Sequence, residues 1–247
     1  MSTRFRQSVF LMLHKDALYK TRKFGNPIYV GDPVNAIKIF NEFEVDEVFI
    51  ADIDCTVKQQ KPNNELLSLI AKTARMPICY GGGITSVEQI RTLLYLGFEK
   101  VMLSSSALYI PNILKDASEK FGRQSVSVCL DVKFNIVQDR YYIYSHNGKK
   151  VFDETLIETI KRLIFSGAGE IVINSIDRDG TYDGYDLKLH DLIENSVTVP
   201  LTLLGGAGSI NDLDQMLSNK RTNAAAGSFW TFYNNSSAVL LNYRNIR

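Results

Sequence analysis

Cysteine, net charge and long apolar runs are all scarce in this sequence. Three cysteines in 247 residues cannot form a closed set of disulfides, and Cys79 and Cys129 lie inside apolar runs, so we expect buried, reduced thiols and a cytoplasmic location. A net charge of +1 argues against a protein that coats nucleic acid, since that task requires a clustered basic surface. The longest apolar stretches, such as residues 9–13, are far shorter than the roughly 20 residues of a membrane-spanning helix. Residues 1–14 do not resemble a secretory signal peptide either.

What the sequence does contain is an internal repeat. Glu47 and Glu170 lie 123 positions apart within similar strings, and this spacing is close to half the chain length. The same spacing relates Asp54 to Asp177, Pro77 to Pro200, Gly82-Gly83 to Gly205-Gly206, Ser86 to Ser209 and Ser104-Ser105 to Gly227-Ser228. Repeated features at one spacing predict a duplication. We therefore expect a single domain over residues 1–247, made of two halves at about 1–123 and 124–247.

Short runs rich in β-branched and aromatic residues alternate with amphipathic stretches along the whole chain. The runs cover residues 7–13, 47–53, 77–80, 100–103, 125–132, 170–174, 200–204 and 223–226. Nearly continuous apolarity over such short lengths is typical of strands buried on both faces of a parallel sheet. Eight strands alternating with about eight helices predict an α/β fold, a (β/α)8 TIM barrel with two-fold internal duplication. A doubly wound open sheet is the alternative, but it would not require matching halves.

Local signals predict where several helices and one hairpin begin. Asp32 precedes Pro33 and is expected to cap a helix, as are Ser86 and Ser209. Residues 153–154 are expected to begin another helix. Residues 140–144 and 149–152 flank an Asn-Gly pair, which is a strong hairpin signal, so an extra β-hairpin is predicted after the fifth strand.

Small residues follow four of the predicted strands. They are Gly81–Gly83, Ser104–Ser106, Gly205–Gly208 and Gly227-Ser228. Glycines allow a backbone to approach an anion closely, and loops of this kind bind phosphate at the mouths of such barrels. Each loop alone could be a mere tight turn. Because the loops form two pairs related by the repeat, we expect two phosphate sites and an elongated substrate with a phosphate at each end.

Carboxylates also occur at the predicted strand ends. Asp131 follows the fifth strand with Lys133 beside it, and it is a candidate general acid or base. Asp52, Asp54 and Asp177 are in similar positions, but helix caps or structural ion pairs explain them equally well. The three histidines show no metal-ligand spacing with one another or with the cysteines, so no metal and no cofactor is expected.

Several strings together resemble one family over almost the whole chain. They are Ser-Ile-Asp-Arg-Asp-Gly-Thr at 175–181, Gly-Tyr-Asp at 184–186, Gly-Gly-Gly-Ile at 81–84, Gly-Asp-Pro-Val at 31–34, Gly-Gly-Ala-Gly at 205–208 and Asp-Val-Lys at 131–133. This set is similar to the cyclase subunit of imidazole glycerol phosphate synthase, the HisF family. The resemblance implies a duplicated barrel that receives ammonia from a glutaminase subunit docked on its opposite face, and passes it through the core to a phosphorylated substrate.

The resemblance also implies roles for particular residues. Asp131 matches a catalytic carboxylate. Substrate and phosphate contacts of the family match Lys20, Gly83, Ser104, Ser105, Asp179, Gly180, Gly206, Gly227 and Ser228, with Lys20 in a long loop after the first strand. A salt-bridged ring that gates ammonia matches Arg6, Glu47, Lys100 and Glu170. Positions facing the glutaminase match Asp46, Glu99 and Gln124.

The sequence departs from the family at the first strand. Family members have a second catalytic aspartate there, and the alignment of the first and fifth strands at an offset of 119 places Met12 in that position. A thioether cannot exchange protons, so this acid–base group is lost. Asn174 and Leu204 stand where the family has a threonine and a serine.

Three interpretations follow. The first is a branch of the family in surface-polysaccharide pathways, in which such a barrel and a glutaminase supply ammonia for sugar amidation by a third protein. The second is a histidine-pathway cyclase in which another residue, such as Asp16, replaces the lost acid. The third is a non-catalytic scaffold that activates a glutaminase.

Overall fold

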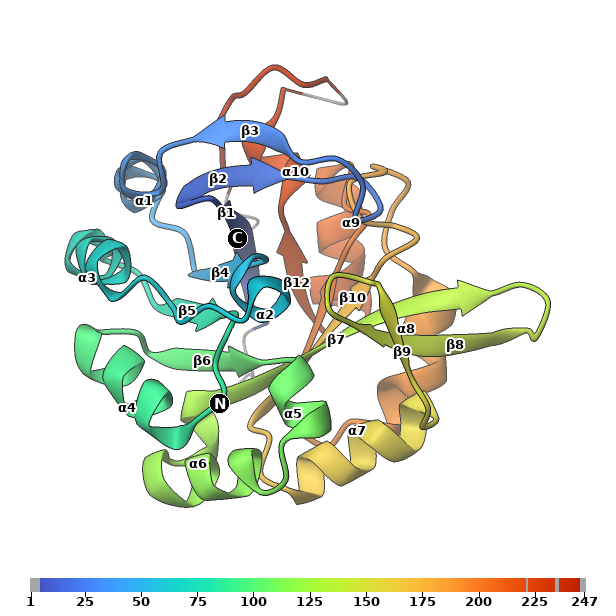
Figure 1. Ribbon diagram of the computed structural model, residues 1–247. Coiled ribbons are helices and arrows are strands. Elements are labelled where there is room, and N and C mark those ends of the chain that lie inside the picture. The colour runs from blue at the N-terminus through green and yellow to red at the C-terminus, as the bar shows by residue number, and fades with distance from the viewer. Residues whose placement is uncertain (1–4, 221, 234–235, 245–247) are drawn as a thin grey trace.

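A closed barrel of parallel strands forms the centre of the protein, which we describe from a computed structural model over residues 5–220, 222–233 and 236–244. Eight strands pair in the order β10-β11-β12-β1-β4-β5-β6-β7, and pairing between β10 and β7 closes the ring (Figure 1). They are β1 (Gln7–His14), β4 (Glu47–Asp52), β5 (Ile78–Gly81), β6 (Lys100–Leu103), β7 (Val126–Asn135), β10 (Glu170–Ser175), β11 (Leu201–Leu204) and β12 (Asn223–Ala226). The predicted (β/α)8 barrel is confirmed.

Helices surround the barrel and bury their apolar faces against the outer surface of the strands (Figure 1). They are α1 (Pro33–Glu42), α2 (Cys55–Lys58), α3 (Asn64–Thr73), α4 (Val87–Leu96), α5 (Ser105–Tyr109), α6 (Ile113–Phe121), α7 (Leu156–Phe165), α8 (Leu187–Ile193), α9 (Ile210–Asp214) and α10 (Ser228–Thr231). Single turns at Arg123–Ser125, Glu194–Ser196 and Gln215–Asn219 complete them. Of the helices in the described residues, none is long and apolar enough to cross a membrane.

The predicted helix starts hold with one exception. Asp32 accepts a hydrogen bond from the Asn35 backbone N–H, and Ser86 and Ser209 each form a capping box with the third residue of the following helix. Helix α7 begins at Leu156, after an N-cap at Thr155, so its predicted start at residues 153–154 was wrong. Thr155 is the N-cap because its backbone is extended and its side chain accepts a hydrogen bond from the Glu158 N–H. Glu154, just before it, forms an ion pair with the Arg162 side chain at 2.7 Å.

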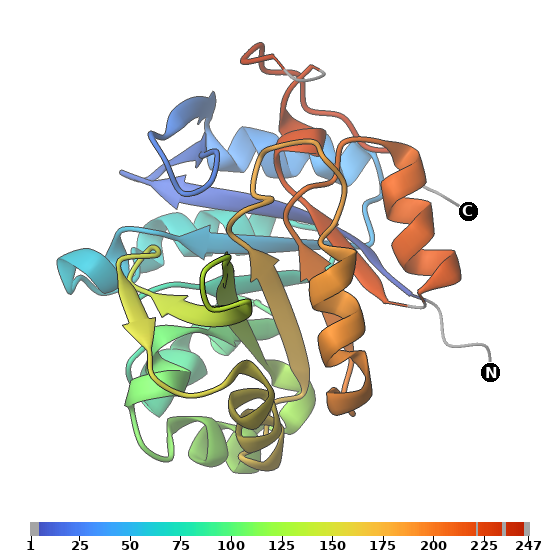
Figure 2. The ribbon, with the colours of Figure 1, turned by 90° about the vertical axis from the view of Figure 1, so that its right-hand side faces the viewer.

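Two antiparallel extensions lie at the end of the barrel where the strands finish (Figure 2). The predicted hairpin is present as β8 (Arg140–Ser145) and β9 (Lys150–Phe152), joined to the end of β7. A second extension, β2 (Ala17–Lys20) and β3 (Ile28–Gly31), follows β1 where a long loop was expected. Its first turn consists of Lys15 and Asp16, both with φ above +50°. Without Asn or Gly at those positions, the sequence contains no hairpin signal there.

Candidate functional site

Four charged side chains meet inside the barrel at the end where the strands begin. Arg6 lies 2.8 Å from Glu170 and 3.4 Å from Glu47, and Lys100 pairs with the same two carboxylates, at 2.6 Å from Glu170. The result is a closed ring in which cations and carboxylates alternate. The structure therefore brings together all four residues of the expected gate, and we call them the charge ring.

The charge ring is almost inaccessible to water. Lys100, Glu47 and Glu170 are each less than 5% exposed, and Arg6 alone has a partly exposed side chain. Burial opposes ionisation of Glu170, but the charges of Lys100 and Arg6 outweigh burial and lower its pKa. The Thr202 hydroxyl donates a further hydrogen bond to Glu170, at 2.6 Å. For Glu47 burial outweighs the charges of the same two cations and raises its pKa, so the electrostatic balance differs between the two carboxylates of the ring.

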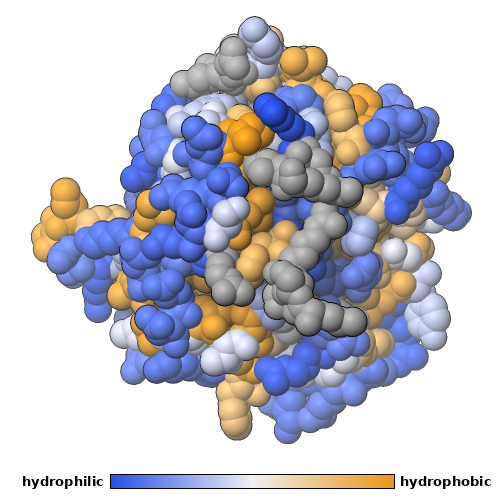
Figure 3. Space-filling model, turned by 180° about the vertical axis from the view of Figure 1, so that it is seen from behind, coloured by the Kyte–Doolittle hydropathy of each residue, from blue (hydrophilic) through white to orange (hydrophobic). Residues whose placement is uncertain are grey.

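The three residues expected to face a glutaminase lie around this same end of the barrel. Asp46 immediately precedes β4, Glu99 precedes β6, and Gln124 lies in the turn before β7. Glu99 and Gln124 are exposed, whereas Asp46 is half-buried and accepts a hydrogen bond from the Gln7 backbone N–H. Viewed from behind, this side of the molecule shows hydrophobic side chains among hydrophilic ones (Figure 3).

An apolar layer separates the charge ring from the opposite end of the barrel. Eight buried residues form one compact cluster: Phe10, Phe49, Cys79, Met102, Cys129, Val172, Leu204 and Ala225. The Lys100 ammonium lies 5.2 Å from the centre of the Phe49 ring, so the layer rests directly on the ring of charges. All three cysteines are free and buried, as expected, and burial raises the pKa of the Cys79 thiol to about 12.

A cavity of about 430 Å³ opens where the strands end. Residues from most sides of the barrel line it, including Phe10, Met12, His14, Thr21, Phe24, Asp54, Gly81, Gly82, Ser104, Ser105, Asp131, His146, Asn147 and Asn174. Active sites of this fold lie at this end, because the loops that follow the strands converge there.

Asp131 lines the cavity from β7. The neighbouring strand β10 places Asn174 beside it, and the Asn174 amide donates a hydrogen bond of 2.9 Å to the Asp131 carboxylate. Burial raises the pKa of Asp131 to about 7; the Asn174 hydrogen bond opposes this shift, and the charge of Asp179 adds to it. Among the described residues Asp131 forms no ion pair, so its carboxyl group can gain and lose a proton near neutral pH. Met12 lines the same cavity from β1.

The loops expected to bind phosphate in the first half are open to the cavity. Gly82, Ser104 and Ser105 line it, and they also line an adjoining cavity of about 650 Å³ that contains Gly83. Gly83 has φ +65°, and its backbone N–H points at the Thr56 hydroxyl, 3.3 Å away. A methyl group at Gly83 would lie 2.4 Å from Cys55 Cβ, so no larger residue fits there.

The loops expected to bind phosphate in the second half are covered. Gly180, Gly206, Gly227 and Ser228 do not line the described walls of the 430 Å³ cavity. Lys20 is buried, and a methyl group on Gly227 would lie only 2.1 Å from its ammonium nitrogen. The segment after β2 is held over this place through Asp179.

Asp179 is the anchor for that segment. Its carboxylate accepts a hydrogen bond of 3.1 Å from the Thr21 hydroxyl, and its backbone carbonyl accepts one of 2.9 Å from the Lys23 N–H. Burial lowers the pKa of Lys20, although the charge of Asp179 opposes this shift. The structure therefore groups Lys20, Asp179, Gly180 and Gly227, but it separates them from the open cavity.

Other carboxylates at strand ends have structural partners. The Asp52 carboxylate accepts hydrogen bonds from the backbone N–H groups of Asp54 and Cys55 at the start of α2, and Asp177 accepts one of 2.9 Å from the Phe134 N–H. Lys133 is exposed and does not line the cavity. For Asp52 the capping interpretation is therefore the better one, whereas Asp177 contacts the backbone of β7 and caps no helix there.

Three residues that line the cavity, His14, His146 and Asn147, were not predicted to do so, and the sequence did not decide whether Asp54 is a candidate acid or base or a structural residue. His14 and Asp54 form a hydrogen-bonded pair, with His14 Nδ1 2.9 Å from the Asp54 carboxylate. His146 and Asn147 come from the turn between β8 and β9, and the Asn147 amide donates a 2.7 Å hydrogen bond to the Ile53 carbonyl, which holds this turn over the cavity. Alternation along β1 could have revealed His14, because Phe10, Met12 and His14 are successive inward positions.

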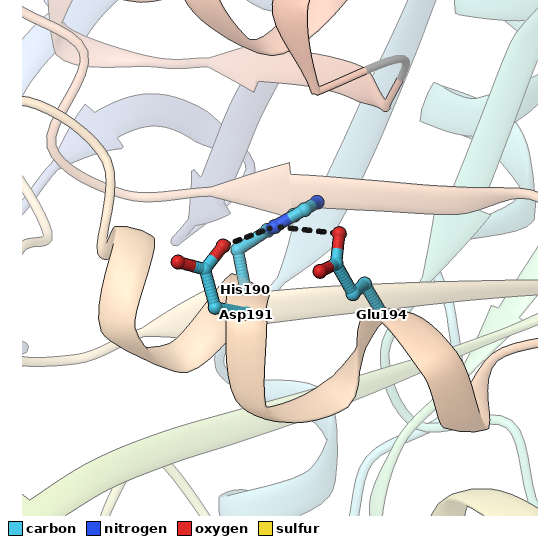
Figure 4. A group of neighbouring side chains, drawn as sticks. All are labelled: His190, Asp191 and Glu194. Carbon is cyan, nitrogen blue, oxygen red and sulfur yellow. Dashed lines mark hydrogen bonds and ion pairs between the residues drawn. The ribbon is translucent and has the colours of Figure 1, made fainter.

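One group of side chains outside the cavity has the composition of a metal site. His190, Asp191 and Glu194 lie near the end of α8 with their ligand atoms within 4.8 Å of one another (Figure 4). The buried His190 ring is held by the Thr222 hydroxyl at Nε2, and Asp191 pairs with the Lys220 ammonium at 2.7 Å. Because Lys220 already supplies the positive charge, the group is explained as a surface ion-pair network.

The fold and the cavity define a class: a (β/α)8 barrel with a candidate active site at the carboxyl ends of its strands and a buried charge ring at the other end. The model of a family described as "Histidine biosynthesis protein" matches residues 15–236. A Vibrio vulnificus relative named "Putative imidazole glycerol phosphate synthase subunit hisF3" is 44% identical over 94% of this chain and 90% of the relative. A relative named "Imidazole glycerol phosphate synthase subunit HisF" from Lacticaseibacillus casei is 36% identical over 80% of this chain and 78% of its own length. The chain belongs to this histidine-biosynthesis family and is of the HisF type.

Proposed function

We propose that this protein is the synthase subunit of a glutamine amidotransferase. It receives ammonia from a HisH-like glutaminase subunit at the charge-ring end, and delivers it through the barrel to a phosphorylated, sugar-type substrate. The pathway we favour is amidation of a sugar in surface-polysaccharide synthesis, with a third protein completing the transfer. The observation that carries this proposal is the pairing of an intact charge ring with a cavity that both Met12 and the Asp131 carboxyl group line.

The layers inside the barrel suit the passage of a small neutral molecule. Ammonia that enters past Arg6 and Lys100 next meets the apolar layer around Phe10 and Phe49. Transfer of an ammonium ion through such a layer is costly, because the ion would lose its hydration without gaining a partner. Neutral ammonia lacks this penalty. The order of charge ring, apolar layer and cavity therefore supports conduction of NH3 toward Asp131.

Phosphate binding is supported most strongly in the first half of the barrel. The backbone at Gly82 and Gly83 and the hydroxyls of Ser104 and Ser105 are reachable from the cavity, and Lys149 lines the same space. In the second half, a phosphate at Gly180 and Gly227 requires the segment around Lys20 to move. We propose that substrate binding opens this segment and that Lys20 then neutralises the second phosphate.

Two observations favour a specialised branch over histidine synthesis. Met12 offers no proton-exchanging group from β1, which the family resemblance leads us to expect there. Vibrio vulnificus also has a second relative, "Putative imidazole glycerol phosphate synthase subunit hisF2", which is only 36% identical to this chain, against 44% for hisF3. Two diverged subunits in one organism support a division of roles.

A histidine-pathway cyclase remains the second candidate, because the relatives carry that name. Asp16 does not supply the lost acid, since it is exposed in the turn after β1 and is absent from the described cavity lining. In a third candidate, a non-catalytic scaffold activates the glutaminase, and its cavity only senses a phosphate ligand.

The deciding experiment measures turnover of the aminoimidazole ribonucleotide substrate of the histidine pathway, with ammonium, and with glutamine plus a HisH-like glutaminase. We expect no turnover at rates typical of the family, and appearance of turnover in Met12→Asp. Wild-type turnover at those rates would overturn the proposal in favour of the histidine pathway. A matched variant, Met102→Asp, places a carboxylate on another cavity wall and should not create activity.

A further inference from the structure

We propose that His14 and Asp54 form a general-base pair at the mouth of the cavity, with His14 as a catalytic residue and Asp54 as its positioning residue. The inference deepens the proposed function, since it supplies the proton-transfer group that Met12 does not. It rests on geometry in the described residues alone.

Asp54 holds the His14 ring in one orientation. The Asp54 carboxylate lies 2.9 Å from His14 Nδ1, and it is itself fixed by the Lys15 backbone N–H at 2.8 Å and the Lys58 ammonium at 3.0 Å. Burial opposes ionisation of Asp54, but hydrogen bonds from Lys15, Lys58 and His14 outweigh burial and lower its pKa. The Asp54 carboxylate therefore stays ionised and accepts a hydrogen bond from the His14 Nδ1–H.

The rest of the His14 ring contacts Tyr19 and lines the cavity. The Tyr19 and His14 rings pack nearly perpendicular to each other, with centroids 4.9 Å apart. In the described part of the chain Nε2 makes no hydrogen bond, although His14 lines the cavity and its side chain is only 17% exposed. With Nδ1 occupied by Asp54, Nε2 is the nitrogen left to accept a proton from a bound molecule.

The position of His14 on β1 explains why this residue can replace the expected acid. Side chains two residues apart in a strand point the same way and lie about 6.6 Å apart. Phe10, Met12 and His14 accordingly all line the cavity. His14 is the next inward position beyond Met12, and β1 approaches the cavity from a different wall than Asp131 on β7.

The proposed step balances its protons. Ammonia adds to a carbonyl carbon of the acceptor, the carbonyl electron pair moves to oxygen, and the new C–N bond leaves nitrogen positively charged. Nε2 of His14 removes a proton from that nitrogen and returns it to the oxygen, which becomes a hydroxyl. The pair ends unchanged, and the Nδ1 proton stays on His14, hydrogen-bonded to the Asp54 carboxylate, throughout.

A proton-abstraction probe tests the base without knowledge of the acceptor. In 5-nitrobenzisoxazole a base removes the C3 proton, the C–H electrons form the nitrile, and the N–O bond breaks to release a coloured phenolate. We expect the full-length protein to accelerate this elimination, and we expect His14→Gln to lower kcat/KM by about 100-fold. His146→Gln is the matched control, because His146 lines the same cavity, and it should change the rate less than about two-fold.

The role of Asp54 needs a readout that folding alone would not change. In Asp54→Asn the amide can donate to Nδ1, which moves the ring proton to Nε2 and removes the base. The ¹⁵N shifts of the His14 ring should therefore report the opposite tautomer, and elimination should fall, while Asp54→Glu should restore both in part. Equal rates for wild type and His14→Gln, or loss of rate in Asp131→Asn instead, would overturn the proposal. Neither outcome depends on whether the protein carries out sugar amidation.

Discussion

The two ends of the barrel treat buried carboxylates in opposite ways. Glu170, at the end where the strands begin, faces Lys100 and Arg6, and its pKa is lowered although it is almost inaccessible. Asp131, at the end where the strands finish, has a hydrogen bond from Asn174 but no ion pair in the described residues, and burial raises its pKa to about 7.

The difference shows which groups are built to stay charged and which are built to change charge. Desolvation acts on both carboxylates, but at Glu170 the charges of Lys100 and Arg6 outweigh it. At Glu47, beside the same two cations, burial still raises the pKa, so the contrast is specific to Glu170 and Asp131. A carboxyl group with a pKa near 7 is suited to proton exchange, whereas a doubly paired one is suited to permanent electrostatic structure. The charge ring and the cavity therefore differ in chemistry as well as in position.

Breaking the charge ring should have the largest effect. Lys100→Met leaves Glu47 and Glu170 buried with only Arg6 between them, and loss of one partner from a buried ion network costs about 3–5 kcal/mol. Urea unfolding should therefore show a much lower free energy of unfolding. Lys188→Met removes an exposed pair with Asp139 and is the control, with an expected change of about 0–1 kcal/mol. Equal losses in the two variants would contradict a special role for burial.

Replacing Asp131, the carboxylate without an ion pair in the described residues, should raise the free energy of unfolding at neutral pH, whereas breaking the charge ring lowers it. An aspartate with a folded pKa near 7 and an unfolded pKa near 4 binds its proton more tightly when folded, so wild-type stability should fall as pH rises from about 4 to 7. The Asp131→Asn variant has no carboxyl group at this position, so its stability should not fall in this way. We expect the variant to gain about 2–4 kcal/mol relative to wild type between pH 4 and pH 8.

Denaturant unfolding at both pH values measures this difference directly. A constant gap between the wild type and Asp131→Asn across the range would show that the pKa of Asp131 is the same in the folded and unfolded protein. The contrast with Glu170 would then not rest on a raised pKa at Asp131.

Replacing Thr202, an uncharged neighbour of the charge ring, should have a smaller effect on the free energy of unfolding. Thr202→Val removes the buried hydroxyl that donates to Glu170 and keeps the side-chain shape, so we expect a loss of about 1.5–3 kcal/mol in thermal or urea unfolding. Thr231→Val is the matched control, because its buried hydroxyl bonds only backbone carbonyls. A larger loss for Thr231→Val would contradict the view that charge makes the Thr202 contact strong.

The barrel itself was predictable because its strands follow simple rules. Each predicted strand matches an observed one closely, since buried parallel strands have near-continuous apolarity and residues such as Ser86 and Ser209 mark the following helices. The extension β2–β3 was not predictable, because Lys15 and Asp16 adopt positive φ angles without the residues that usually signal such a turn.

The site was predictable in part, for a related reason. The strand-end position indicated Asp131, and the family resemblance implied the four ring residues, of which Glu47, Lys100 and Glu170 begin strands and Arg6 directly precedes one. His14 and Asp54 were missed as a pair because their contact joins β1 to the segment after β4, 40 residues away in sequence. The burial of Lys20 was also missed, since it depends on β2, which the sequence does not signal.

The smallest predicted effect concerns the hydrogen bond from Asn174, which lowers the pKa of the Asp131 carboxyl group. Asn174→Leu removes the donor whose contact lowers the pKa of that carboxyl group, so the pKa should rise above about 7, by up to about one unit. Stability should change little below that pH, because leucine also removes the buried Asn174 amide oxygen, which has no partner in the described residues. A ¹³C titration of the Asp131 carboxyl, assigned with Asp131→Asn, measures the shift. An unchanged or lower pKa would show that solvent in the cavity, rather than Asn174, stabilises the ionised carboxylate, and the contrast with the fully paired Glu170 would then reflect water access instead of protein partners.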